Sequence, residues 1–457
     1  MPQQDTSHGQ SAAGTNLYRR YFRLTALNVL ANVTVPLAGL VDTAILGHLA
    51  DIRYLAGVAL ASLLFDYVYW TFGFLRMGTT GTTAQAVGRG DERGAYLILY
   101  RSILLALGVS AALLALQWPI RSLGFTLLSG TPEVELAGQA YFNARIWGAP
   151  AALTSFAFIG WYLGREESRY VLAMTVAANV TNVVLDYVLI VHMGMAAAGA
   201  GVATMVSQYV GLATALVIFF RLRRPRRWRW PEVLDRRGLA SLITLNREIL
   251  VRTLGLITTF ALFTNFSSML GTVTLAANAI LLRVLNLASY LIDGAAFATE
   301  SLAGIFRGER NMGDLRRLVR LSLLLGEGCA LIFIGALVLR PTALYGVLTS
   351  HSEVLAAAAQ FGRWLVPALL FGSVAYIYDG LFLGLTEGRT LRNSMLFSAT
   401  LVFLPFAWLA VRFESNHLLW LAMVLFMVAR AATLGFATRS VLHADVGGNQ
   451  KTRARPA

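Results

Sequence analysis

The sequence is a series of long apolar segments separated by short polar loops. An α-helix needs about 20 apolar residues to cross the hydrocarbon core of a bilayer, and uncharged runs of that length have few other ways to fold. With 56% hydrophobic and 14% charged residues, the chain is predicted to be an all-α, multi-pass protein of the inner (plasma) membrane. The twelve predicted transmembrane helices lie near residues 22–49, 55–83, 95–117, 136–163, 170–192, 197–220, 243–269, 275–303, 317–340, 355–384, 392–412 and 417–440.

Arginines are distributed unevenly between these segments. Most of them flank one set of helix ends, and the opposite ends hold only Arg53, Arg121, Arg340 and Arg412. Because arginine-rich loops stay in the cytoplasm, both termini are predicted to be cytoplasmic. The same placement explains the formal charge of +14, so this charge does not indicate nucleic-acid binding. The expected partners are membrane lipid and small amphipathic or cationic molecules, with no obligatory protein partner and a monomeric chain.

The sequence carries no signature of an enzyme. A single cysteine, Cys329, excludes an internal disulfide and a cysteine metal cluster, and the six histidines lack metal-ligand spacing. Gly88 and Gly90 lie in a loop without a preceding strand, so they do not form a phosphate-cradling motif. Residues 1–16 contain no apolar run, and no cleavable signal peptide is expected. We predict no catalytic residues, no cofactor and no metal, apart from Na⁺ as an alternative coupling ion.

The two halves of the chain resemble each other. Leu55–Leu60 aligns with Leu275–Ile280, an offset of 275 − 55 = 220 residues. The same offset relates Gly88 to Gly308, Gly160 to Gly380 and Gly164 to Gly384. Equal helix number and direction predict two six-helix lobes related by a parallel repeat, as in alternating-access transporters. The predicted regions are an N-terminal tail (1–21), an N-terminal lobe (22–222), a basic cytoplasmic linker (223–242), a C-terminal lobe (243–440) and a cytoplasmic C-terminal tail (441–457).

Polar residues interrupt three helices of the first half at helical spacing. Residues three or four apart share one face of a helix. The residues that do so are Asn28, Asn32, Gly39 and Asp42 in the first helix, Thr175, Asn179, Asn182 and Asp186 in the fifth, and Thr204 and Gln208 in the sixth. Counted from the outer ends of their helices, Asp42, Asp186 and Thr204 all lie about 10 Å deep. We therefore expect two carboxylates, a carboxamide and a hydroxyl at one level of the outer half of the membrane.

Two carboxylates in a low dielectric cannot both stay ionised without help. The pair is expected to take up a proton or to bind a cation such as Na⁺ among oxygen ligands. Pro36 and Gly39 precede Asp42, so the first helix is expected to bend there. The alternative is a buried polar network that only holds helices together.

Three stretches resemble the MATE (multidrug and toxic compound extrusion) transporters, and more narrowly their DinF-like branch. They are Val-Asp-Thr-Ala-Ile-Leu-Gly-His-Leu at 41–49, Asn-Val-Val-Leu-Asp-Tyr-Val-Leu-Ile at 182–190 and Gly-Ala-Gly-Val-Ala-Thr at 199–204. In that branch an acidic cluster of the N-terminal lobe binds the coupling ion. The resemblance implies that this site falls on Asp42, Asn182, Asp186 and Thr204. The NorM-like branch instead uses acids of helices seven and ten.

The second half matches the NorM-like arrangement only in part. Helix seven has Glu248 at its cytoplasmic end alone, and helix ten retains Asp379. Asp293 is expected either to line the substrate cavity or to pair with a basic residue such as Arg283. Further residues predicted to line the cavity are Asn32, Asn179, Gln208 and Asp379.

Other charged residues lie inside apolar segments. Asp66, Arg76 and Glu300 have no assigned role, and Arg145 and Arg363, at similar outer positions of helices four and ten, are expected to be structural anchors. The predicted function is secondary active multidrug efflux, exchanging amphipathic or cationic compounds for protons (or Na⁺) by alternating access. One alternative is a lipid-linked oligosaccharide flippase of the same superfamily, which the intramembrane arginines Arg76 and Arg145 favour. The other is a membrane-integral enzyme or structural subunit.

Overall fold

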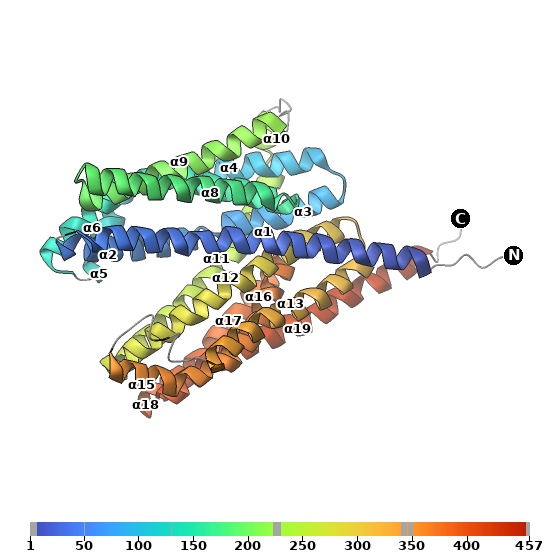
Figure 1. The fold of residues 1–457 in the computed structure, drawn as a ribbon. Helices are drawn as coiled ribbons and strands as arrows, with labels where there is room; N and C mark the ends of the chain where they lie inside the picture. Colours follow the sequence, from blue (N-terminus) through green and yellow to red (C-terminus); the bar gives the residue numbers. More distant parts are fainter. Residues whose placement is uncertain are drawn as a thin grey trace. The chain divides into compact units, whose positions relative to one another are not determined.

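The computed structural model describes residues 7–49, 51–128, 130–222, 230–339, 345 and 351–453, without the side chains of 7–15 and 443–453. The helices of the first half are α1 (Ser7–Gly47), α2 (Ile52–Thr71), α3 (Phe74–Gly88), α4 (Glu92–Ala115), α5 (Gln117–Leu128), α6 (Pro132–Arg145), α7 (Ala149–Gly164), α8 (Ser168–Asp186), α9 (Ala196–Leu222) and α10 (Trp230–Val233). Those of the second half are α11 (Arg236–Met269), α12 (Thr272–Gly308), α13 (Met312–Leu339), α15 (Ser352–Phe361), α16 (Leu365–Gly384), α17 (Gly388–Phe397), α18 (Leu404–Arg412) and α19 (Asn416–Arg453). Figure 1 follows them in chain order.

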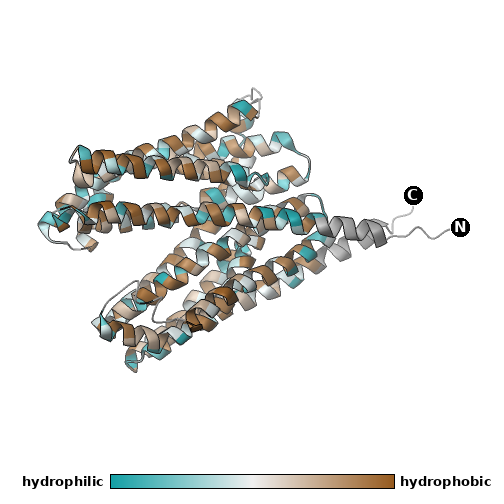
Figure 2. Cartoon of the chain, in the orientation of Figure 1, coloured by the Kyte–Doolittle hydropathy of each residue, from teal (hydrophilic) through white to brown (hydrophobic). Residues whose placement is uncertain are grey.

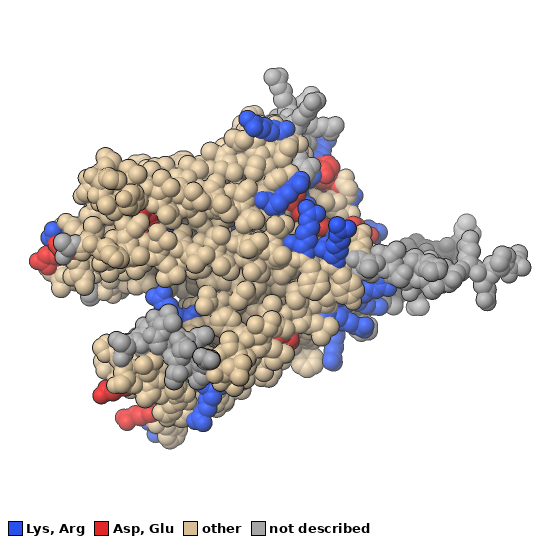
Figure 3. Space-filling view, viewed as in Figure 1, with Lys and Arg blue, Asp and Glu red and all other residues tan. Residues whose placement is uncertain are grey.

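Twelve helical passes in the described residues are long and apolar enough to cross a membrane, which confirms the predicted number and order. Several passes consist of two consecutive helices, such as α2 with α3 and α6 with α7. Many large apolar side chains are exposed, as expected of surfaces that contact lipid. Hydrophobic residues recur along the helices (Figure 2). In the view of Figure 3, uncharged residues cover most of the surface, and arginines gather mainly at one end of the helices. Arg340, residues 223–229 of the predicted linker and the last residues of the predicted tail lie outside the described part.

The chain forms two compact units whose boundaries fall inside two helices. One unit is Leu30–Asn246, and the other joins Met1–Val29 to Arg247–Ala457. The helix α1 therefore contributes to both units, whereas the predicted lobes assign it entirely to the first. The contacts of its first part explain the difference. Tyr21 hydrogen-bonds Thr299 (3.1 Å) and the Ala295 carbonyl (3.2 Å).

The internal repeat is visible in the packing of glycines against backbone. A Cβ on Gly160 or Gly164 would overlap the carbonyl oxygens of Arg76 and Thr80, which lie on α3. A Cβ on Gly380 or Gly384 would overlap the carbonyl oxygens of Ala296 and Glu300, which lie on α12. All four pairs of equivalent positions differ by 220 residues. Each unit therefore uses the same close helix contact, and the predicted parallel repeat is confirmed.

The unit formed mainly by the second half has a large apolar core between α11, α12, α16, α18 and α19. Phe263, Trp420 and Phe426 are completely buried there. A network of hydrogen bonds between Asn278, Asn416 and Trp420 crosses this core, and none of their buried side-chain nitrogen and oxygen atoms lacks a partner. The Asn278 and Asn416 carboxamides hydrogen-bond each other reciprocally at 2.7 and 3.0 Å, and the Trp420 indole donates to Asn278 at 2.9 Å. Because every polar group in it has a partner, the network fixes α12 against α19 at little cost.

Candidate functional site

The site in the unit Leu30–Asn246 is organised around Asp186, the last residue of α8. Its side chain is fully buried, and Asn182, one turn earlier, donates from Nδ2 to Asp186 Oδ2 at 3.0 Å. After Asp186 the backbone widens into a π-helical turn, Tyr187–His192, before it reaches α9. Such turns interrupt the regular α-helix and occur frequently at functional sites. The local sequence thus places a carboxylate and its carboxamide donor on one buried face.

Asp42 reaches this carboxylate from α1. Its carboxyl group lies within hydrogen-bonding reach of Asp186. The Oδ1 atoms of both residues are buried and accept no hydrogen bond from the described part of the chain. A carboxylate can only accept hydrogen bonds, so two carboxylates in contact need a shared proton or a cation. The structure therefore brings together Asp42, Asn182 and Asp186, which the sequence had placed at one level.

Of three further predicted residues, Asn179 lies on α8 itself, and Thr204 and Gln208 lie on the neighbouring helix α9. The helix α9 runs beside α8 (Figure 1), and its Thr204 hydroxyl donates to the Ala200 carbonyl at 2.9 Å. This bond occupies the proton of the hydroxyl and leaves its oxygen lone pairs for another ligand. Asn179 Nδ2 and Gln208 Oε1 are buried, and neither atom has a hydrogen-bond partner within the described residues. No contact places Thr204 on the carboxylates, so its part in the site stays a prediction, as does the cavity-lining role of Asn32.

The predicted hinge lies within a continuous helix. Pro36 is inside α1 and cannot donate the backbone hydrogen bond that the Asn32 carbonyl would otherwise accept. A Cβ on Gly39 would meet nothing within 4 Å, so packing does not require glycine there. The Gly39 carbonyl accepts a hydrogen bond from the Thr43 hydroxyl at 2.8 Å. These features weaken the helix one and two turns before Asp42, and bending at this place stays a prediction.

Arg145, expected to be a structural anchor, belongs to the surroundings of this site. Its guanidinium lies over the Phe65 ring (4.5 Å from carbon Cζ to the ring centroid) and near the rings of Tyr141 (5.5 Å) and Tyr69 (5.7 Å). Its Nη1 donates to the Tyr141 hydroxyl at 2.8 Å. The guanidinium is also close enough to the Asp42 carboxylate for the two charges to attract. Sequence inspection gave no sign that these residues would meet.

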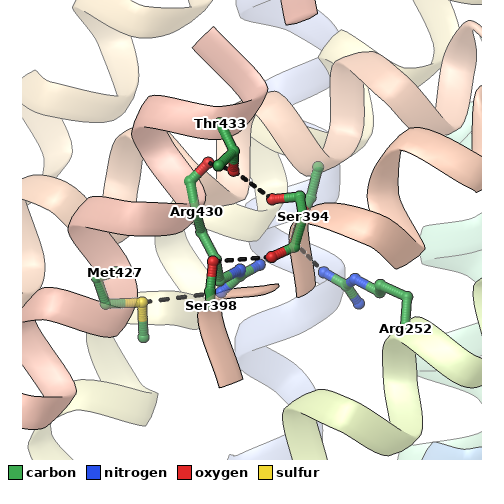
Figure 4. Close-up of polar contacts among 7 residues, drawn as sticks. Arg252, Ser394, Ser398, Met427, Arg430 and Thr433 are labelled. Atoms are coloured by element: carbon green, nitrogen blue, oxygen red, sulfur yellow. Dashed lines mark hydrogen bonds and ion pairs between the residues drawn. The ribbon is translucent and has the colours of Figure 1, made fainter. Parts of the chain in front are cut away.

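The second repeat has a different arrangement around Asp379. This carboxylate is buried and forms ion pairs with Arg252 of α11 and Arg430 of α19, which are also buried. Figure 4 shows the two arginines pointing toward the same place, with Ser394 and Thr433 hydrogen-bonded beside them at 2.6 Å. Two fixed cations therefore neutralise the acid of helix ten. Arg252 and Arg430 were missed, although an arginine in the middle of an apolar segment is as conspicuous a signal as Asp42.

Two other acids of the second half, Glu248 and Asp293, have basic neighbours too. Glu248, buried near the start of α11, forms ion pairs with Arg392 (2.5 Å) and Arg247 (3.0 Å). We expected Asp293 to line the cavity or to pair with a basic residue such as Arg283. It lies within electrostatic reach of Arg430. The charge of Glu248 is thus compensated by arginines, and a fixed positive charge lies within electrostatic reach of Asp293.

Comparison with known proteins identifies the family. The MatE family profile matches the chain twice, over residues 28–188 and 249–409. The chain belongs to the MatE family. The two matches are offset by 249 − 28 = 221 residues, in agreement with the internal repeat. The family consists of membrane transporters, so this multi-pass protein is a transporter and not an enzyme.

Relatives of known name support this assignment along the whole chain. DNA damage-inducible protein F of Escherichia coli (strain K12) is 33% identical over 418 residues, which cover 89% of this chain and 88% of that protein. A probable multidrug resistance protein NorM of Thermotoga maritima is 26% identical and covers 88% of this chain and 87% of the relative. The resemblance to the DinF-like branch is thereby confirmed.

Solved structures show the same fold. A MATE transporter in a bent conformation has a TM-score of 0.85 at 20% identity, with 96% of this chain and 97% of that chain covered. The straight conformation has the same TM-score at 20% identity and covers 94% of this chain and 96% of that one. At this level of identity the likeness supports the fold alone, which is the predicted MATE-type, twelve-helix architecture.

Proposed function

We propose that this MatE-family protein is a secondary active antiporter that exports amphipathic or cationic compounds in exchange for a cation bound by Asp42 and Asp186. The observation that carries the proposal is the contact of two carboxyl groups whose buried Oδ1 atoms have no partner among the described residues. Asp379 and Glu248 are neutralised by arginines instead. Relatives named as multidrug resistance proteins favour drugs as the exported compounds.

The coupling ion follows from the atoms that the site supplies. A proton needs only the two carboxyl groups, one of which then donates a hydrogen bond to the other. Na⁺ needs about five or six oxygens, and the side chains of Asp42, Asn182, Asp186 and Thr204 with a backbone carbonyl near Ala200 would have to converge. The Thr204 hydroxyl donates to the Ala200 carbonyl, and no contact among the described residues brings either oxygen to the carboxylates. We therefore favour protons over Na⁺.

Alternating access would use the weak point of α1. Ion binding at Asp42 changes the charge that this helix carries near its outer end, and Pro36 offers a position where the helix can bend at low cost. With both termini in the cytoplasm, the ion enters the site from outside and the exported compound leaves in the opposite direction. No protein partner is needed for this cycle.

The second candidate, an oligosaccharide-lipid flippase, rests on arginines inside apolar segments, at first on Arg76 and Arg145. Arg252 and Arg430 are held by Asp379, and Arg145 is held by aromatic rings and a tyrosine hydroxyl. Arginines with such partners are less available to a phosphate-bearing lipid than free ones would be. The antiporter is therefore the better supported function.

The proposal is tested with purified protein in proteoliposomes that contain a fluorescent cationic dye. An imposed pH gradient in Na⁺-free buffer is compared with a Na⁺ gradient at fixed pH, with the same dye and the same protein. We expect efflux with the pH gradient alone. If efflux requires the Na⁺ gradient, the coupling ion bound at this site is Na⁺ and not a proton. The absence of efflux under both gradients would contradict the antiporter function.

A further inference from the structure

Arg145 is held in place by groups from two helices. It is the last residue of α6, and its side chain lies among the rings of Phe65 and Tyr69 on α2 and Tyr141 on α6. The faces of aromatic rings attract a cation, and the Tyr141 hydroxyl accepts a hydrogen bond from Nη1 at 2.8 Å. Ser62 supports that hydroxyl by donating to it at 3.4 Å. We call Phe65, Tyr69 and Tyr141 the aromatic cage.

The cage holds the guanidinium without neutralising it. The rings are uncharged, and the buried Nε of Arg145 has no acceptor in the described residues. Asp66 and Asp42 both attract the guanidinium electrostatically. Gln208 and Tyr209 of α9 also lie within interaction distance of the Tyr69 hydroxyl. A positive charge is thus fixed within electrostatic reach of Asp42.

This arrangement differs from that of Asp379 in the other unit. Asp379 pairs directly with two arginines, so a mobile cation finds its charge already compensated. The charged groups of the described residues that act on Asp42 are the Asp186 carboxyl and the Arg145 guanidinium, so two ionised carboxylates and one guanidinium would leave a net negative charge to attract an ion. The cage keeps Arg145 within electrostatic reach of Asp42. The buried Oδ1 atoms of Asp42 and Asp186 still have no hydrogen-bond partner in the described residues.

We propose that Arg145 is a positioning residue for ion release: held by the aromatic cage, its guanidinium stabilises the ion-free, doubly negative state of Asp42 and Asp186. The inference rests on the proposed function. An antiporter must empty its ion site in every cycle, and two adjacent carboxylates in a low dielectric resist losing their ion. A nearby fixed cation offsets that cost by Coulomb attraction. Without Arg145 the ion would bind more tightly and leave more slowly.

The test compares Arg145→Gln with Arg145→Lys in proteoliposomes. Two quantities are measured for each protein: the dependence of efflux on outside proton concentration, and dye counterflow without an ion gradient. For Arg145→Gln we expect the half-maximal proton concentration to fall on the order of tenfold, because the missing charge no longer disfavours the ion-bound state. The maximal rate of ion-driven efflux should fall several-fold more than the rate of dye counterflow, because only efflux requires release of the ion. Arg145→Lys keeps the charge and should restore most of the wild-type profile.

Arg363→Gln is the matched control. Arg363 lies at the similar outer position of the second repeat and is exposed to the surroundings, so removing its charge should leave both measurements unchanged. Tyr141→Phe keeps the ring and removes only the hydroxyl that holds Nη1. It should shift the proton dependence in the same direction as Arg145→Gln, but less, and it decides the question if Arg145→Gln does not fold.

Two results would overturn the inference. An unchanged proton dependence in both Arg145→Gln and Tyr141→Phe would contradict it, and so would an equal loss of efflux and counterflow that lysine does not restore. Both are read against wild-type protein that performs proton-driven efflux. If the wild type shows no ion-driven efflux, the proposed function itself fails, so the two failures are distinguishable.

Discussion

An acidic side chain inside a membrane has three ways to remain stable: pairing with a fixed cation, holding a proton or binding a mobile cation. Asp379 uses the first way, through Arg252 and Arg430. Asp42 and Asp186 contact each other and leave one oxygen of each without a donor in the described residues, so the other two ways are open to them. At the scale of single residues, the same chemical group therefore serves structure in one unit and is suited to ion coupling in the other.

Asp42→Asn and Asp186→Asn should each abolish ion-driven efflux. The carboxamide has nearly the same size and cannot exchange a proton, so the pair loses its ability to bind and release the ion. We expect at least a tenfold loss of pH-driven dye efflux, with dye binding retained. Asp51→Asn is the control, because asparagine caps α2 as well as aspartate does. Wild-type efflux by Asp42→Asn would disprove the assignment.

Asp379→Asn should reduce stability before it reduces transport. It leaves two buried guanidinium groups without their carboxylate, and breaking a buried ion pair from one side costs about 3–5 kcal/mol. Thermal unfolding in detergent should therefore occur at a markedly lower temperature than in the wild type. The fraction of the variant that stays folded should retain appreciable transport. Unfolding at the wild-type temperature would show that the arginines have other partners.

At the scale of helices, small residues decide how closely two helices approach. The helices α7 and α16 each place two glycines against the backbone carbonyls of α3 and α12. A side chain at these positions has no space, because the neighbouring atoms belong to backbone and cannot rotate away. The repeat thus preserves a contact between helices rather than the identity of the surrounding side chains.

Gly160→Ala and Gly380→Ala should each destabilise the protein. The added methyl group overlaps a carbonyl oxygen of the neighbouring helix, and overpacking of this kind costs about 1–3 kcal/mol. Gly108→Ala is the matched control, since a Cβ there meets nothing within 4 Å and alanine favours the helix. The temperatures of unfolding should rank Gly108→Ala at or above the wild type and the other two below it. An equal effect at all three positions would exclude the contact as the cause.

At the scale of the whole molecule, one scaffold is used twice with different chemistry. The family profile matches both halves, yet the carboxyl pair lies in the unit Leu30–Asn246 and the Arg-Asp-Arg cluster in the other. The helix α1 belongs to both units, because its first part contacts α12 through Tyr21 and its second part carries Asp42. One helix thus takes part in the packing of both units.

The orientation of the molecule can be tested with single cysteines in a Cys329→Ala background. Arg237→Cys should react with a membrane-impermeant thiol reagent only after cell lysis, because arginine-rich loops are retained in the cytoplasm. Glu133→Cys, at the start of α6, should react in intact cells. Both positions are exposed, so accessibility within the protein does not limit labelling. Reversed labelling would invert the topology and place Asp42 in the inner half of the membrane.

The sequence by itself determined the class of fold, the number of helices and the internal repeat. These properties depend on local hydrophobicity and on spacing along the chain, both of which are readable without contacts. It also placed Asp42, Asn182 and Asp186 at one level, because helical rise converts residue number into depth. The contact of the two acids agrees with that expectation.

Only the tertiary structure decided which charges meet. Arg145 lies 80 positions from Phe65, and Arg252 lies 127 positions from Asp379. Nothing local distinguishes a caged arginine from an ion-paired one, since both appear in the sequence as one basic residue among apolar neighbours. The division of α1 between two units has the same origin: hydropathy defines a continuous helix, and only the packing of Tyr21 against Thr299 assigns its first part to the second half.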